Sequence, residues 1–243
     1  MSFGLVIIGD ELLAGTREDR HLIRFRAMLA ARGHALAWSW ILPDDPDCLI
    51  DHLRRSMAGR QPVFCCGGIG ATPDDRTREA AAAAARVPLA RHAGAQALIE
   101  ARFGRDAYPH RILMADLPSG SELVPNPYNK IPGFSLRNHF FLPGFPQMAW
   151  PMAEWVLEHR FATGQEAHRE SAVVVKGVAE SALVPLMQRF TARYPALKLF
   201  SLPHLGAEQS VELGFRGRDG LEQAMLALQR ALQDHGFEFE PKG

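Results

Sequence analysis

The sequence predicts an α/β protein built on a mostly parallel, doubly wound sheet, followed by a small α+β lobe. Three observations indicate this class. Residues 5–8 and 62–66 are short, continuous apolar runs ending at glycine, typical of strands buried on both faces of a parallel sheet. Helical segments alternate with these runs. Conspicuous loops follow both strands, where open parallel sheets bind their ligands.

The first quarter of the chain alternates strands and helices. Apolar residues spaced three and four apart predict a helix over 21–32, which ends at Gly33. A strand over 35–42, a helix over 47–57 and the strand over 62–66 follow. This βαβαβ order predicts parallel strands joined by right-handed crossovers, so the carboxyl ends of the strands meet at one edge.

The middle of the chain is less regular. Helical propensity predicts helices over 79–86 and 95–103. Residues 104–139 hold many prolines, glycines and asparagines and predict an extended loop system, and loops of this length are often functional. A strand over 140–142, a proline-glycine turn and a helix over 147–160 complete the predicted large domain.

A composition break at 162–168 predicts a linker between two domains, residues 1–162 and 168–240. The second domain is expected to be a small α+β lobe with the order βαββα. Its expected elements are strands over 172–175, 197–202 and 210–215 and helices over 181–194 and 221–233.

Charge and composition exclude several function classes. Lysine and arginine number 27 and aspartate and glutamate also number 27, so no overall field favours nucleic acid or an anionic membrane. Three cysteines are too few for a disulfide framework. No basic leader or run of roughly 18 apolar residues occurs. We therefore expect a cytoplasmic protein that binds neither nucleic acid nor membranes.

The most informative segment is the loop over 67–77, which lies between a predicted strand and a predicted helix. Gly67, Gly68 and Gly70 let the backbone take positive φ and point successive N–H groups at an anion. A helix beginning near Pro73 would add the positive end of its dipole. The loop therefore predicts a phosphate site.

The same loop carries two adjacent carboxylates, Asp74 and Asp75. They would repel a phosphate unless a cation lay between, and Mg²⁺ typically binds one or two carboxylates plus substrate phosphates. In a purely structural alternative, Thr72 is an N-cap, Pro73 is the first helical residue and Asp75 belongs to a capping box. That alternative leaves the glycines and Asp74 unexplained, so we favour a ligand-binding loop.

Other loops add candidates. Asp10 and Glu11 follow the first strand and either cap the next turn or contact a ligand or metal. The loop over 125–133 offers amide and ammonium groups suited to a polar ligand edge, with a solvated turn as the alternative. No zinc-ligand spacing and no nucleophile-elbow sequence occurs.

Four motifs in order resemble one family. GDELLAG with the following Asp19, GGIGATPDDRT, PNPYNKIPG and LPGFPQM are similar to motifs of the molybdopterin-binding (molybdenum cofactor biosynthesis) domain. Within that superfamily they most resemble the N-terminal domain of competence/damage-inducible protein A. The resemblance covers roughly residues 4–160, and VKGVAESALVPLM resembles the small lobe that follows this domain.

The resemblance implies a three-layer α/β/α fold, homo-oligomers and a small-molecule ligand. Some family members are metal-dependent pyrophosphatases of ADP-ribose, and others bind or adenylylate molybdopterin. The amidohydrolase domain of full-length members has no counterpart in the sequence, so its activity is expected to be absent. Two positions depart from the family: Ala71 stands where proline is common, and His21 stands where asparagine is common.

We therefore predict metal-dependent hydrolysis of a nucleotide diphosphate bond, with Asp75, Asp74 and Asp10 as catalytic residues. Asp75 and Asp10 are the expected ligands of Mg²⁺ or another divalent cation such as Co²⁺. Molybdopterin binding and a non-catalytic binding module remain alternatives. The expected ligand-binding residues are Gly9, Glu11, Gly67, Gly68, Gly70, Thr72, Thr77, Asn126, Asn129, Lys130 and Gly144.

Overall fold

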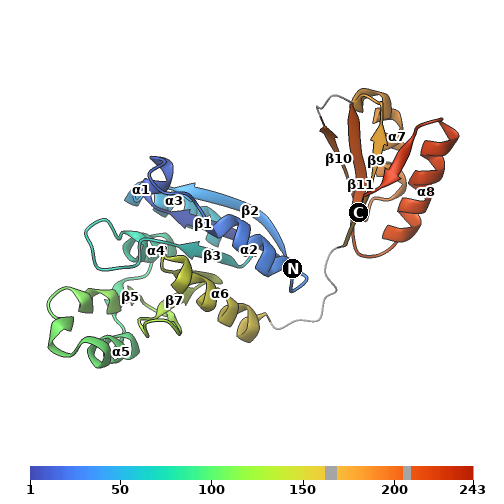
Figure 1. The fold of residues 1–243 in the computed structure, drawn as a ribbon. Coiled ribbons are helices and arrows are strands. Elements are labelled where there is room, and N and C mark those ends of the chain that lie inside the picture. The colour runs from blue at the N-terminus through green and yellow to red at the C-terminus, as the bar shows by residue number, and fades with distance from the viewer. Residues whose placement is uncertain (162–168, 205–208, 243) are drawn as a thin grey trace. The chain divides into compact units, whose positions relative to one another are not determined.

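The computed structural model describes residues 1–161, 169–204 and 209–242 (Figure 1). The chain divides into two compact units, Met1–Gln165 and Glu166–Gly243. The predicted linker over 162–168 lies outside the described residues.

The first unit is built on a six-stranded sheet with the order β2-β1-β3-β8-β7-β6. Four neighbouring strands are parallel, and β7 runs against both of its neighbours. The mostly parallel sheet predicted from the sequence is confirmed. The strands are β1 (Ser2–Ile8), β2 (Ala35–Leu42), β3 (Val63–Cys66), β6 (Glu122–Val124), β7 (Gly133–Leu136) and β8 (His139–Leu142).

Helices cover both faces of this sheet, as the three-layer prediction requires. Strand residues alternate between the faces, so Val6 packs in one core cluster and Ile7 in the other. The cluster of Val6 includes residues of α3 (Pro46–Met57), α4 (Thr77–Ala85) and α5 (Ala93–Phe103). The cluster of Ile7 includes α2 (His21–Ala30) and α6 (Pro146–Arg160). No described helix is long and apolar enough to cross a bilayer.

The predicted loop system over 104–139 contains more regular structure than expected. It holds the 3-10 helices η1 (Gly104–Ala107) and η2 (Arg111–Ala115), together with β6 and β7. It also holds β5 (Asp116–Pro118), which pairs with the unexpected β4 (Leu89–Arg91). The prediction was wrong here because strands of three or four residues between turn formers show no readable periodicity.

The second unit has a four-stranded antiparallel sheet with the order β10-β11-β9-β12. Its elements are β9 (Arg169–Lys176), α7 (Glu180–Arg193), β10 (Lys198–His204), β11 (Ser210–Gly217), α8 (Leu221–Asp234) and β12 (Phe239–Pro241). Buried residues such as Leu213, Phe215 and Leu228 form a separate core. The predicted βαββα order lacks only β12, whose three residues gave no strand signal.

Candidate functional site

A cavity of about 450 Å³ lies at the carboxyl ends of the parallel strands, the expected place for a ligand in this fold. We call it the loop pocket. Most predicted site residues line it: Gly9, Glu11, Gly67, Gly68, Gly70, Thr72, Asp74, Asp75, Asn126, Asn129 and Gly144. Asp10, Thr77 and Lys130 are not among its lining residues.

The glycines of the loop are required by its geometry. Gly68 has φ +65°, and a Cβ atom there would lie 2.2 Å from the hydroxyl oxygen of Thr77. Gly67 has φ +119°, and its Cβ would lie 2.2 Å from the carbonyl oxygen of Ile8. Any larger side chain would force the backbone away from β1 and α4.

The helix after the loop begins later than predicted. α4 begins at Thr77, whereas residues near Pro73 form a separate turn. The Thr77 N–H donates to the Gly68 carbonyl (2.9 Å), and the Thr77 hydroxyl donates to the Gly67 carbonyl (3.0 Å). Thr77 is fully buried, so it anchors the loop from behind. The first helical N–H therefore serves the loop itself rather than a ligand.

The Asp75 side chain is hydrogen-bonded to Thr72 within the same loop. Its Oδ2 atom accepts hydrogen bonds from the Thr72 N–H (2.9 Å) and the Thr72 hydroxyl (2.5 Å). A Cβ at Gly70 would lie 2.4 Å from the same oxygen. This arrangement is half of the anticipated capping box, formed on an isolated turn rather than at a helix start. The neighbouring Asp74 is exposed.

Arg78, which the sequence interpretation overlooked, holds the loop from α4. Its buried guanidinium donates to the Gly70 carbonyl (2.9 Å), the Asp116 carbonyl (3.1 Å) and the Leu113 carbonyl. Burial lowers its pKa, although the charges of Asp75 and other carboxylates oppose this effect. The only sequence feature that could have indicated a role for Arg78 is its position next to Thr77 at the start of a predicted helix.

Asp10 pairs with a second missed residue, Asp44, which follows β2. The Asp10 N–H donates to Asp44 Oδ2 (3.1 Å), and the Asp44 N–H donates to Asp10 Oδ1 (3.2 Å). Desolvation raises the pKa of Asp44; the hydrogen bond from the Asp10 N–H opposes this effect, and the nearby charges of Asp10, Glu11 and Asp74 add to it. Asp44 also lines the loop pocket. The sequence signal was available, because Asp44 follows a parallel strand at the same edge as Asp10.

Asp10 and Asp44 are suited to a divalent cation that takes most of its other ligands from a bound substrate. Among the described residues, no three histidine, cysteine, aspartate or glutamate side chains form a metal-binding group. Oδ1 of Asp10 accepts a hydrogen bond from the Asp44 N–H, and Oδ2 of Asp44 accepts one from the Asp10 N–H. Two carboxylates with phosphate and water oxygens are a typical Mg²⁺ ligand set. The pair therefore fits a substrate-bridged divalent cation.

Two asparagines form the amide part of the pocket wall. Asn126 is 3% exposed, and its Oδ1 accepts hydrogen bonds from Tyr128 N–H (3.0 Å) and Asn129 N–H (3.4 Å). Its Nδ2 is buried without a hydrogen-bond partner among the described residues. Lys130 donates instead to the carbonyl of Pro127 within its own loop. The structure therefore places the asparagines, but not Lys130, at the cavity.

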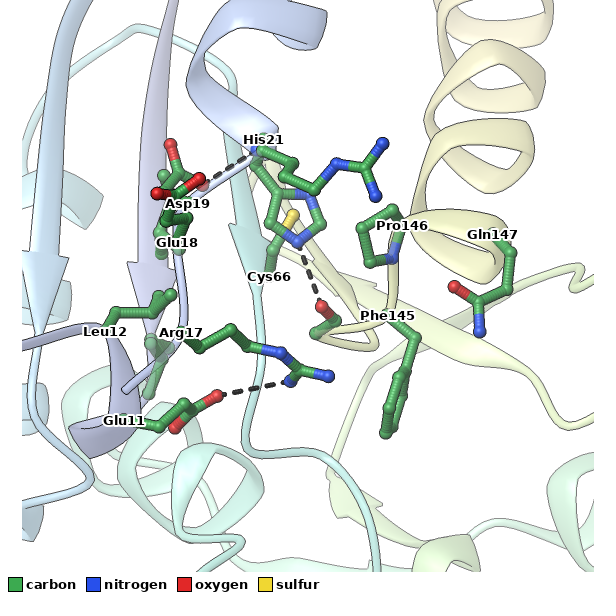
Figure 2. Close-up of a pocket in the computed structure, with 14 residues that line it drawn as sticks. Glu11, Leu12, Arg17, Glu18, Asp19, His21, Cys66, Phe145, Pro146 and Gln147 are labelled. Carbon is green, nitrogen blue, oxygen red and sulfur yellow. Dashed lines mark hydrogen bonds and ion pairs between the residues drawn. The ribbon is translucent and has the colours of Figure 1, made fainter. Parts of the chain in front are cut away.

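His21 connects α2 to the turn before α6. Its Nε2 donates to the Gly144 carbonyl (3.0 Å), as Figure 2 shows. Burial lowers the pKa of His21, which favours the neutral ring. His21 therefore makes a fixed contact with Gly144, which also lines the loop pocket.

Comparison with known proteins agrees with this fold. The family model described as "Probable molybdopterin binding domain" matches residues 4–163. A CinA-like protein of Geobacter sp. (strain M21) is 33% identical over 200 residues, covering 77% of this chain and 47% of that protein. A CinA-like protein of Anaeromyxobacter dehalogenans (strain 2CP-1) is 32% identical over 189 residues, covering 74% and 46%.

A solved structure supports the fold. The crystal structure of the protein CinA with unknown function from Thermoplasma acidophilum has a TM-score of 0.60 and 24% identity to this chain. The match covers 65% of this chain and 96% of that one.

The fold defines a three-layer α/β/α protein, and the loop pocket lies at the carboxyl ends of its parallel strands. The chain belongs to the molybdopterin-binding domain family and is similar to the N-terminal part of CinA-like proteins. The resemblance stated from its motifs is confirmed. The chain spans about half the length of these CinA-like relatives.

Proposed function

We propose that the loop pocket binds a phosphate-bearing heterocyclic ligand and that the protein hydrolyses the diphosphate bond of a nucleotide such as ADP-ribose. The observation that supports this proposal is that the glycine loop and Asp44 line one cavity, and that Asp10 is hydrogen-bonded to Asp44. Gly67 and Gly68 bring the backbone to the ligand, and Asp10 and Asp44 lie at the neighbouring strand ends.

Different residues of the loop pocket bind different parts of the ligand. Backbone N–H groups of the glycine loop hold phosphate oxygens, as in other anion sites built on strand-to-helix turns. The Nδ2 of Asn126, which has no hydrogen-bond partner among the described residues, donates to an acceptor of the ligand. Apolar side chains of the same pocket, including Ile69, Ile131 and Met148, contact the flat face of the heterocycle.

A divalent cation, Mg²⁺ or Co²⁺, would be held by Asp10 and Asp44 together with the substrate phosphates. Such a cation offsets charge on the phosphoryl oxygens. Asp75 was predicted as a ligand of this cation, and that role stays a prediction. Its contacts with Thr72 support a positioning role for Asp75 in the loop. Glu11, which lines the same pocket, is the candidate for general base.

The test is AMP release from ADP-ribose, followed by chromatography with and without Mg²⁺ or Co²⁺. Asp10→Asn and Asp44→Asn should each lower metal-dependent turnover at least tenfold, because each removes one negative charge facing the cation. Asp51→Asn is the matched control, since Asp51 lies on the exposed face of α3 and pairs with Arg54.

Release of AMP that is independent of metal, or unchanged in both variants, would refute the carboxylate assignment. Absence of AMP release with every divalent cation, despite measurable ADP-ribose binding, would leave a binding module without catalysis.

Molybdopterin binding is the second candidate function, and the family match favours it. The asparagine amides and apolar wall of the loop pocket suit a pterin ring as well as an adenine ring. Calorimetric titration with a stable pterin phosphate separates the two candidates. Tighter binding of the pterin phosphate than of AMP would favour a role in molybdenum cofactor biosynthesis.

A further inference from the structure

The strand β2 forms one edge of the six-stranded sheet, and among the described strands it pairs with β1 alone (Figure 1). Its eight residues, Ala35–Leu42, include no charged side chain and no proline. An open strand edge presents unpaired N–H and C=O groups, and proteins usually protect it with charges, proline, bulges or a very short strand. β2 uses neither charge, proline nor shortness.

The other described edges of the two larger sheets are protected. β6 and β12 have three residues each, and they carry Glu122 and Glu240. β10 is longer, but it contains Lys198 and Pro203, and proline has no N–H to donate. The edge of β2 therefore differs in kind from the other three.

The regular part of the open edge runs over residues 38–42, because a register shift interrupts the pairing of β1 with the first half of β2. At the end of the strand, the Leu42 carbonyl accepts a hydrogen bond from the Gly9 N–H, so the backbone polar groups of Leu42 point toward β1. These groups alternate in direction along a strand. The N–H and C=O of Ser39 and Ile41 therefore point to the open edge.

Apolar side chains flank this edge on both faces of the sheet. Ile41 is 42% exposed, on the face that α2 covers. Trp38 and Trp40 are half-buried on the other face, and their rings stack with centroids 4.3 Å apart. A further strand along β2 would cover these side chains and also pair the outward backbone groups.

We propose that the open edge of β2 binds the same edge of a second copy of this chain, so that two six-stranded sheets join across a two-fold axis. In antiparallel self-pairing, each copy supplies the same row of donors and acceptors, which is the self-complementarity that a two-fold interface requires. Because β2 carries no charge, the pairing brings no like charges of the two strands together. The inference is independent of the proposed function.

The test is analytical ultracentrifugation of the full chain over a range of concentrations, because an interface built on one strand pair is small and the dimer should dissociate on dilution. Ser39→Lys should weaken dimerisation at least about tenfold, since self-pairing brings the two lysines close together. Ala97→Lys is the matched control: Ala97 is exposed on α5, apart from β2 (Figure 1), so the same added charge should leave the dimer unchanged.

A mixture of Ser39→Lys and Ser39→Glu should form the dimer again, because opposite charges then meet across the axis. A chain that is monomeric at every concentration overturns the proposal. So does an oligomer that Ser39→Lys leaves unchanged while circular dichroism shows a native fold.

If Ser39→Lys does not fold, hydrogen exchange of the unaltered chain decides. The Ser39 and Ile41 amides should be protected at concentrations where the chain is dimeric and should exchange fast on dilution. Fast exchange of both amides in the oligomer would assign the interface to another surface and overturn the proposal.

Discussion

At the scale of single residues, the site depends on side chains that hold the backbone of the loop rather than face the cavity. Arg78 and Thr77 are buried and donate hydrogen bonds to carbonyls of the loop and of neighbouring segments. Gly68 then occupies the space that the Thr77 hydroxyl leaves. Substitutions of these residues are therefore expected to act through loop position and stability.

Arg78→Leu should lower the free energy of unfolding by about 2–4 kcal/mol, because buried carbonyl acceptors lose their charged donor. The measurement is urea denaturation followed by circular dichroism. Arg76→Leu is the control: Arg76 is exposed and forms an ion pair with Glu79 three residues on, so its loss should cost under about 1 kcal/mol. Equal effects of the two substitutions would contradict a structural role for the Arg78 guanidinium.

Asp75→Asn should weaken AMP binding about tenfold, because the Thr72 N–H and hydroxyl lose a charged acceptor and the loop opens. Hydrogen exchange of the 68–76 amides should rise in the same variant. Thr72→Val removes only the hydroxyl donor and should produce a smaller change in the same direction. If Asp75→Asn abolishes turnover while binding and exchange are unaltered, Asp75 acts directly in catalysis as first predicted.

At the scale of elements, a buried histidine ties α3 to the start of β8. His139 donates through Nδ1 to the Arg137 carbonyl (3.0 Å), and Ser56 of α3 donates its hydroxyl to His139 Nε2 (2.8 Å). Burial lowers the pKa of His139 to about 4, because the charged ring is poorly solvated there. Neutral His139 is therefore the form that the fold stabilises.

This histidine should make the first unit less stable in mild acid. In the unfolded chain His139 has its ordinary pKa of 6.5. Below that pH the His139 ring is protonated in the unfolded chain, whereas in the folded chain it stays neutral down to about pH 4. Stability contributed at neutral pH is lost as pH falls from about 6.5 to about 4, by about 3 kcal/mol in total.

The check is urea denaturation at pH 7 and pH 4 for the unaltered chain and for the double variant His139→Phe, Ser56→Ala. The variant should lose less stability on acidification, because it lacks the titrating ring. An identical pH dependence would show that His139 does not titrate as inferred.

At the scale of the whole molecule, the two units have separate cores, and the loop pocket lies in the first unit. Residues 1–165 and 166–243, expressed separately, should therefore each unfold cooperatively, and the first should keep the AMP affinity of the full chain. Calorimetry and denaturation of the two fragments test this. Loss of AMP binding in the first fragment would assign the second unit a part in the site. The homo-oligomer expected from the family stays a prediction that light scattering can test.

Much of the candidate site could be predicted because its residues follow strands in the sequence. Glycines and carboxylates directly after buried apolar runs fall at one edge of a parallel sheet, so Gly67, Gly68 and Asp74 could be assigned to a pocket before their positions were known. Asp44 could have been found by the same rule. Arg78 could not, because its partners lie 35 and 38 residues along the chain as well as in the loop.

The sequence by itself determined the α/β class, the parallel core strands and the family, because burial on both faces of a strand and a glycine turn each leave a local pattern. Only the tertiary structure decided which candidates face the ligand. In the structure, Thr77 is buried and anchors the loop, and Lys130 donates a hydrogen bond within its own loop. A second cavity lies beside the loop pocket. Side-chain direction depends on packing between distant segments, and such packing has no local signature.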